Sequence, residues 1–375
     1  MAALMEELVE DILLRFPPDD PASLVRATLV CKQWCRLISS QGFHRRFREF
    51  HRTPPVLGIL CNSSDNDVDK VRLVPTHSFP HTDRVYINWR AADARHGRVL
   101  LVKMPTEHRA ELWYRPNLMD LVFAVWDPVT DEARELPRLP RCPNYCWNAA
   151  VLCAATTCDH QDCSRGPFLV VVLDAKGGKH YIHVYSSESG KWSQQTVHVQ
   201  DPGEYISRYW MRPSVLVGDE LCSMFLQRDS ILKYNVRTRQ ISVMDLPSLW
   251  YKPDLLISTD DGRLGFAAVR NSKFYLRSME DGPGGNAVWT EMRVVVELKL
   301  PVDALVTSPT AIGFAADVGL VFVATDVGVF SFDLRSHRVR KILTRSQYSN
   351  GNKIVPYMSF YTPAFELRGP LRVKD

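Results

Sequence analysis

The chain has 375 residues, of which 45% are hydrophobic and 23% are charged. These values are usual for globular proteins and exclude a disordered or fibrous chain. The formal net charge of +4 is small for this length, so the composition does not indicate a nucleic-acid-binding protein.

The first residues, MAALMEELVED, are acidic where a signal peptide needs a basic start. The apolar runs are too short to span a bilayer, so we expect no membrane partner. The nine cysteines are an odd number without the tight spacing of a disulfide framework. We therefore expect a reducing compartment, in the cytoplasm, the nucleus or both.

Residues 1–52 have the apolar spacing of short helices. Leu4, Leu8 and Ile12 are four residues apart, which places them on one helix face, and Pro17 follows as a helix breaker. About fifty residues of short helices cannot bury all these side chains among themselves, so the rest of the chain or a partner must cover some of them. Acidic residues dominate 1–25 and basic residues dominate 26–52. The basic half is either a solvated face or a surface for an acidic partner.

From residue 53 to 375 the pattern changes to short β runs that are separated by turn residues. A strand followed by a polar turn recurs, anchored by Trp126, Tyr185, Tyr234, Leu276 and Phe332 with gaps of 59, 49, 42 and 56 residues. A period near fifty with about four strands per unit is typical of a kelch-like β-propeller blade.

These anchors account for five blades. Residues 54–75 and 352–373 are β-like and incomplete, and together they predict a sixth blade that closes the ring. The expected fold is therefore a small all-α domain at 1–52, followed by an all-β, six-bladed kelch-like propeller at 53–375. A single β-sandwich is the structural alternative, but the β region is too long for one.

The helical segment LMEELVEDILLRFPPDDPASLVRATLVCKQWCRLIS resembles an F-box. That motif has an Ile-Leu pair, a proline and a Val-Cys-x-x-Trp ending, which match Ile12-Leu13, Pro17 and Val30 to Trp34. Met5 stands where the family usually has proline. By this resemblance, the adaptor-binding residues would be Leu4, Met5, Leu8, Ile12, Leu13, Pro17, Leu24, Val30, Cys31 and Trp34.

The remainder resembles the F-box-associated propeller of a plant family best known from grasses, in pieces such as VWDPVTDE, AAVLCAATTCDHQDC and VYSSESGKWS. The resemblance implies a non-catalytic substrate receptor of a cullin-type (SCF) ubiquitin ligase. The F-box would bind a Skp-family adaptor and through it a cullin, and the propeller would hold an unknown protein substrate. Two alternatives remain: a hydrolase-like propeller enzyme with a site in the central channel, and an F-box protein that acts outside a ligase.

Long loops rich in Trp, Tyr and Arg should collect on one face of the propeller, and these residue types dominate interface energies. The loops are 104–119, 141–147, 202–212 and 248–254. We expect about half of their aromatic residues to cap blade cores instead. The predicted substrate-binding residues are Trp113, Tyr114, Arg115, Tyr145, Trp147, Tyr205, Tyr209, Trp210, Arg212, Trp250 and Tyr251.

No phosphate-binding loop, HExxH or GxSxG motif is present, and no cofactor is expected. The predicted inner strands at 149–155, 214–218 and 310–316 are nearly free of charge, which argues against a catalytic channel. Cys158, His160, Asp162 and Cys163, with Cys153 nearby, contain zinc-ligand types. They lie within a short stretch and lack a second separated pair, so the spacing favours a polar turn with unpaired thiols over a metal site.

Overall fold

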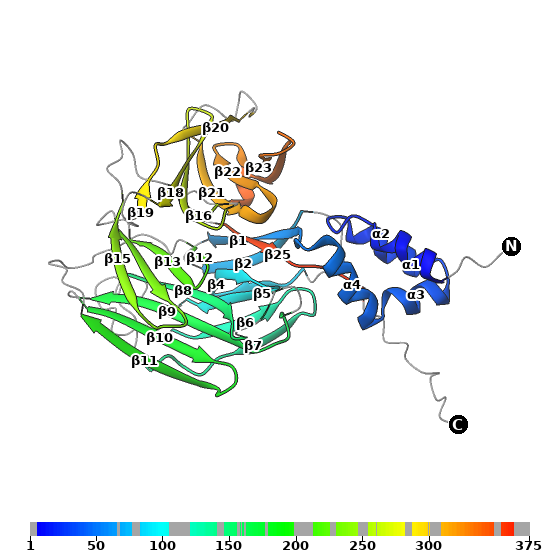
Figure 1. The fold of residues 1–375 in the computed structure, drawn as a ribbon, viewed down its shortest axis with the longest axis horizontal. Coiled ribbons are helices and arrows are strands. Elements are labelled where there is room, and N and C mark those ends of the chain that lie inside the picture. The colour runs from blue at the N-terminus through cyan, green and yellow to red at the C-terminus, as the bar shows by residue number, and fades with distance from the viewer. Residues whose placement is uncertain are drawn as a thin grey trace.

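The computed structural model has an N-terminal group of helices beside a large all-β body (Figure 1). The residues that it describes are 6–65, 68–76, 83–104, 121–140, 146–155, 158, 160, 163–176, 179–198, 213–225, 230–246, 254–259, 261–281, 287–298, 300, 309–348 and 354–363. None of the described helices is both long enough and apolar enough to cross a lipid bilayer.

The helical domain has four helices: α1 (Glu6–Leu14), α2 (Pro21–Thr28), α3 (Lys32–Ile38) and α4 (Gln41–His51). Local chemistry sets their starts. Pro21 occupies the first turn of α2, and the Ser40 hydroxyl caps α4 by accepting a hydrogen bond from the Phe43 amide at 3.1 Å. Cys31 precedes α3, and its thiol caps that helix by accepting a hydrogen bond from the Trp34 amide.

The buried faces of these helices meet in one apolar core. Leu13, Leu24, Ile38, Phe43 and Phe47 are almost completely buried in it. This core is small, and it leaves other apolar side chains of the same helices outside it.

The described strands form six sheets, which we call blades 1 to 6. Blade 1 has β25 (Ile354–Met358), β1 (Val56–Asp65), β2 (Val68–Pro75) and β3 (Val85–Ile87). Blade 2 has β4 (Trp89–Arg95), β5 (Arg98–Lys103), β6 (Phe123–Asp127) and β7 (Glu132–Glu135). Blade 3 has β8 (Cys146–Cys153), β9 (Phe168–Lys176), β10 (Lys179–Ser186) and β11 (Lys191–His198).

The second half of the ring repeats this plan. Blade 4 has β12 (Val215–Val217), β13 (Glu220–Phe225), β14 (Ser230–Asn235) and β15 (Ile241–Asp245). Blade 5 has β16 (Leu255–Ser258), β17 (Leu264–Arg270) and β18 (Lys273–Asp281), with β19 (Ala287–Trp289) and β20 (Arg293–Glu297) both pairing with β18. Blade 6 has β21 (Thr310–Ala315), β22 (Leu320–Thr325), β23 (Gly328–Asp333) and β24 (Val339–Thr344). Two short 3₁₀ helices, η4 (Ala316–Val318) and η5 (Arg345–Gln347), complete the described elements.

The ring closes by pairing the two ends of the β region. Strand β25 pairs antiparallel with β1, with Leu60 opposite Val355 and Cys61 opposite Ile354. The prediction that both ends share one blade, and that the blades number six, is therefore confirmed. This arrangement removes the open sheet edges that a linear array would leave.

The propeller core consists of six apolar clusters, each between two consecutive blades, with the last joining blade 6 to blade 1. The strands nearer the centre of the ring are therefore buried on both faces, which explains apolar runs such as that of β17. The five residues that anchor the sequence repeat all lie on the third strand of their blades. They are Trp126, Tyr185, Tyr234, Leu276 and Phe332. Trp126, Tyr185, Tyr234 and Phe332 are at most 1% exposed there, because each fills the gap to a neighbouring blade.

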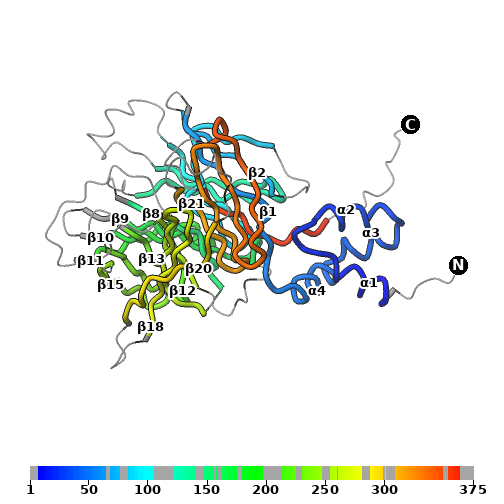
Figure 2. The backbone as a smooth tube through the Cα atoms, turned by 90° about the horizontal axis from the view of Figure 1, so that it is seen from above, coloured from blue at the N-terminus to red at the C-terminus, as the bar shows by residue number. Residues whose placement is uncertain are grey.

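The helical domain sits on one face of the ring, where the chain enters β1 and leaves β25 (Figures 1 and 2). The Ser359 amide donates a hydrogen bond to the Pro55 carbonyl, and the ring of Phe360 packs edge-on against Phe47 with centroids 6.2 Å apart. We call this the helix-side face. It also carries the turns between first and second strands, because the Tyr357 hydroxyl near the end of β25 donates to the Gly97 carbonyl in the β4–β5 turn.

Candidate partner-binding surfaces

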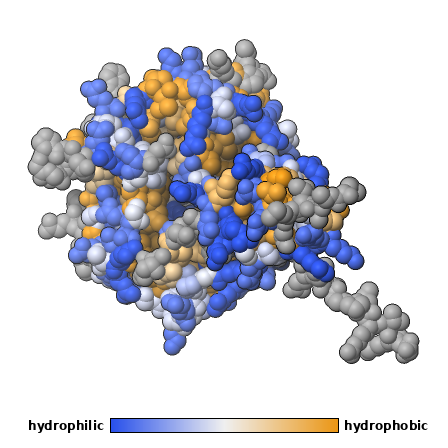
Figure 3. Space-filling view, turned by 45° about the vertical axis from the view of Figure 1, so that its right-hand side comes forward, coloured by the Kyte–Doolittle hydropathy of each residue, from blue (hydrophilic) through white to orange (hydrophobic). Residues whose placement is uncertain are grey.

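Large apolar side chains are exposed on the helical domain. Leu8 and Ile12 of α1 are 52% and 50% exposed, and they lie about one helical turn apart, away from the buried Leu13. At the corner after α2, Leu29 and Val30 are 77% and 63% exposed. Figure 3, which brings the helical side forward, shows hydrophobic residues at the surface there. We call Leu8, Ile12, Leu29 and Val30 the apolar helical surface. So many exposed apolar side chains in a small domain indicate a protein-binding site.

The predicted adaptor-binding residues divide between this surface and the core beneath it. Leu8, Ile12, Pro17, Val30 and Cys31 are exposed, and Trp34 is half-buried. Leu13 and Leu24 are buried in the helical core, where they support the helices that carry the exposed residues. Leu4 and Met5 lie outside the described residues.

Basic side chains accompany the apolar helical surface. Lys32 and Arg36 on α3 are exposed and follow Val30 closely along the chain. The bases of α4 are partly neutralised, since Arg46 contacts Glu10 of α1 and Arg45 pairs with Glu49. The corner at Leu29 and Val30 therefore has basic neighbours, whereas the exposed Glu7 and Asp11 adjoin Leu8 and Ile12 on α1. The basic corner suits an acidic part of a partner's surface.

The predicted substrate-binding residues lie, except for Trp147, outside the described residues. The strand ends that their loops join, such as those of β5 and β6, are on the face opposite the helical domain, which we call the far face. Trp147 at the start of β8 packs edge-on against Phe123, with ring centroids 5.9 Å apart, and is only half-buried. It therefore caps the apolar cluster between blades 2 and 3. This is the role expected for about half of the aromatic residues in these loops. Trp126, Trp192, Trp89 and Trp289 pack in or against the clusters between blades.

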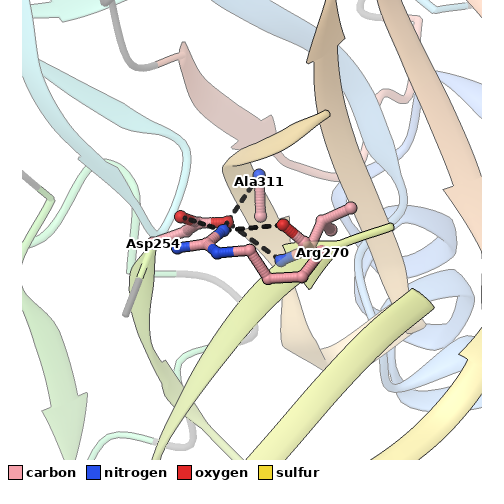
Figure 4. Close-up of polar contacts among 4 residues, drawn as sticks. Asp254, Arg270 and Ala311 are labelled. Atoms are coloured by element: carbon pink, nitrogen blue, oxygen red, sulfur yellow. Dashed lines mark hydrogen bonds and ion pairs between the residues drawn. The ribbon is translucent and has the colours of Figure 1, made fainter. Parts of the chain in front are cut away.

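Two buried carboxylates lie on or next to the first strands of their blades, and neither was predicted from the sequence. Asp254, just before β16, accepts hydrogen bonds from the amides of Val269 and, on blade 6, Ala311, at 2.9 and 3.0 Å (Figure 4). Its other oxygen accepts from Arg270 Nη1 at 2.9 Å. One side chain thus connects two blades and is engaged at both oxygens.

Asp93 of β4 makes a similar link on the opposite side of the ring, between blades 2 and 3. Its Oδ2 accepts a hydrogen bond from the Val151 amide on β8 at 2.9 Å, and Arg95 Nη1 lies 3.5 Å away. Burial raises the pKa of Asp93, although Arg95 and the backbone amides act in the opposite direction. Both carboxylates therefore link neighbouring blades.

The β8–β9 loop brings together the cysteines and the histidine noted in the sequence. One ligand atom from each of Cys153, Cys158, His160 and Cys163 lies within 4.8 Å of all the others. We call these four residues the Cys–His cluster. Burial, followed by the neighbouring thiols of Cys153 and Cys158, raises the pKa of Cys163 to about 12. Sequence spacing undervalued Cys153, because the antiparallel return of the hairpin, with Cys153 opposite Phe168, is what brings it beside the loop.

Comparison with known proteins agrees with the helical domain. Residues 4–46 match the sequence profile of the F-box domain. A search of curated proteins returned no match. The chain therefore has an F-box domain followed by a six-bladed β-propeller.

Similar solved structures include bacterial proteins. A protein of unknown function from Bacteroides caccae is 12% identical, with a TM-score of 0.46 over 80% of this chain and 98% of that chain. A protein from Lactobacillus plantarum is 15% identical, with a TM-score of 0.40 over 76% and 81%. Virginiamycin B lyase from Staphylococcus aureus is 11% identical, with a TM-score of 0.38 over 77% and 86%. Likeness at this level carries no argument about function.

Proposed function

We propose that this protein is the substrate-recognition subunit of an SCF-type ubiquitin ligase in the cytoplasm, the nucleus or both. The observation that carries the proposal is the apolar helical surface on a domain that matches the F-box profile. F-box domains generally bind Skp-type adaptors, and this surface offers exposed apolar side chains for such a contact. The adaptor would in turn connect the chain to a cullin.

The junction between the two domains supports a receptor role. The Phe47–Phe360 contact and the hydrogen bond from Ser359 to Pro55 fasten the helical domain to the ring-closing strand. A substrate held on the propeller would therefore keep a restricted position relative to the adaptor. A closed ring is also a rigid scaffold for long recognition loops.

The far face is the proposed substrate-binding face. Its loops hold Trp113, Tyr209, Trp210 and Trp250, and the strand ends that they join point away from the helical domain. A substrate on this face would leave the apolar helical surface open to the adaptor. The helix-side face, which carries the β8–β9 loop, is the rival site.

One observation bears on the enzyme alternative, and the other alternative has to be separated by experiment. A propeller enzyme needs carboxylates or a metal at its channel, whereas Asp93 and Asp254 are occupied in linking blades. An F-box protein acting outside a ligase has the same two domains, and only its associated proteins distinguish it.

The test is capture of associated proteins by the full chain in cells with the proteasome blocked. The test variant carries Leu8→Asp and Ile12→Asp. The matched control is Val294→Asp, which changes an equally exposed apolar residue on β20, remote from the helices. Wild type and control should bring down a Skp-family adaptor, a cullin and ubiquitinated proteins, and the variant should lose adaptor and cullin. Adaptor without cullin would favour a role outside a ligase, and equal adaptor capture by all three would overturn the proposal.

A further inference from the structure

The Cys–His cluster lies at the tip of blade 3 and takes no part in the proposed function. Cys153 is the last residue of β8, and the other three ligands come from the loop that returns to β9. Cys163 is buried, Cys153 and Cys158 are half-buried, and His160 is exposed. Three sulfur atoms and one imidazole nitrogen therefore converge from two sides of a hairpin.

The distances suit one tetrahedral metal ion. A zinc ion with Zn–S bonds of about 2.3 Å holds its sulfur ligands about 3.8 Å apart. The ligand atoms of the cluster lie within 4.8 Å of one another, and Cys163 Sγ is 3.7 Å from His160 Nδ1. Side-chain shifts of about 1 Å or less would bring all four into the coordination sphere.

Two hydrogen bonds from backbone amides orient the described residues of the cluster and its flank. The His160 amide donates a hydrogen bond to Cys158 Sγ at 3.3 Å, and the Gly166 amide donates to the Cys163 carbonyl at 3.0 Å. His160 has a φ of 61°, in the left-handed region, and its Nδ1 faces the Cys163 thiol. Backbone amides that donate to sulfur stabilise thiolates and orient them, as the surroundings of metal ligands commonly do.

Neighbouring residues supply support and charge balance. The buried Arg98 guanidinium donates to the carbonyls of Cys163 and Gly166, and the ring of His96 stacks on His160 with centroids 4.3 Å apart. Three thiolates, a neutral imidazole and Zn²⁺ carry one net negative charge. The positive charge of the buried Arg98 would offset it on the side of the site that is closed to solvent.

We propose that Cys153, Cys158, His160 and Cys163 form a structural zinc site. Sulfur-rich tetrahedral ligand sets select zinc over oxygen-preferring ions such as Mg²⁺ and Ca²⁺. Four protein ligands leave no open position, so the ion would be structural and not catalytic.

The site lies close to the contact between the two domains. A Cβ atom on Gly97 would be 3.1 Å from Ser164 Cβ in the β8–β9 loop and 3.2 Å from Ser359 Oγ. Gly97 therefore lies between the loop and the segment that leads from β25 to Phe360. Zinc would fix the loop against the turn that supports this segment.

The test measures metal in the purified full chain. Elemental analysis of protein produced with zinc should find about one zinc per chain. Cobalt added to the zinc-free protein should give the intense visible absorption of a tetrahedral thiolate site. Cys153→Ser and Cys163→Ser should lose both signals, while Cys35→Ser, a half-buried cysteine outside the cluster, should keep them.

A second variant protects the test against misfolding. His160 is exposed, so His160→Ala should fold, yet it should lose zinc to a mild chelator that leaves wild type loaded. Absence of zinc and of cobalt absorption in wild type would overturn the proposal. So would zinc that Cys153→Ser and His160→Ala retain as firmly as wild type, or bound iron or copper in its place.

Discussion

The pair Leu8→Ala and Ile12→Ala tests whether the apolar helical surface binds the adaptor. Full burial of a Leu or Ile side chain contributes about 1.5–3 kcal/mol. Since each side chain is about half exposed in this structure, binding would bury the remaining half, which is about 0.8–1.5 kcal/mol per residue. Removing both should weaken adaptor binding by about 1.5–3 kcal/mol, or about 10- to 150-fold in Kd.

The assay is calorimetric titration of the full chain with a purified Skp-family adaptor, together with thermal unfolding. The double variant should unfold within a few degrees of wild type, because exposed side chains contribute little to the core. Leu13→Ala is the matched contrast on the same helix. Leu13 is fully buried, so this change should destabilise the helical domain by about 2–5 kcal/mol. A wild-type Kd for the double variant would refute the assignment of this surface to the adaptor.

Three further predictions concern the propeller. Ending the chain after residue 350 removes β25, so β1 gains an open edge and the protein should aggregate in size-exclusion chromatography; a monomer that melts cooperatively would contradict this closure. Asp254→Ala should lower the free energy of unfolding in urea by about 2–4 kcal/mol, since it removes the acceptor of two buried amides and the ion-pair partner of the partly exposed Arg270. Asp254→Asn, which keeps one acceptor, should cost less, and equal stability of all three proteins would show that the carboxylate does not link the blades. Trp210→Ala with Trp250→Ala should reduce substrate capture while changing unfolding free energy by no more than about 0.5 kcal/mol. Unchanged capture by this pair, lost instead when 157–166 is altered, would move the substrate to the helix-side face.

Much of the fold followed from periodic features of the chain. Trp126, Tyr185, Tyr234 and Phe332 recur because each blade needs a large apolar side chain on its third strand to fill the gap to its neighbour. The helices were equally predictable, since Leu8, Ile12 and Pro17 express a local spacing and a local breaker. The incomplete β pattern at both ends also predicted a shared blade, because an unpaired edge is unfavourable.

Other features depend on contacts between residues far apart in the chain. The sequence placed Leu8 and Leu13 in one F-box motif, but only packing against α4 decided that Leu13 is core and Leu8 is surface. Asp254 looked like a residue of an ordinary loop, and its role emerged from the approach of Ala311 on the next blade.

The Cys–His cluster shows the same division. Residue types and order marked Cys158, His160 and Cys163 as conceivable ligands, whereas their linear spacing left the set one ligand short. The fourth position is filled by Cys153 because β8 and β9 pair antiparallel, so that the end of one strand lies beside the loop that precedes the other. The sequence by itself determined which ligands and which repeating core residues were available. The tertiary structure decided which of them meet, because strand pairing and blade packing bring together atoms that the order of the chain keeps apart.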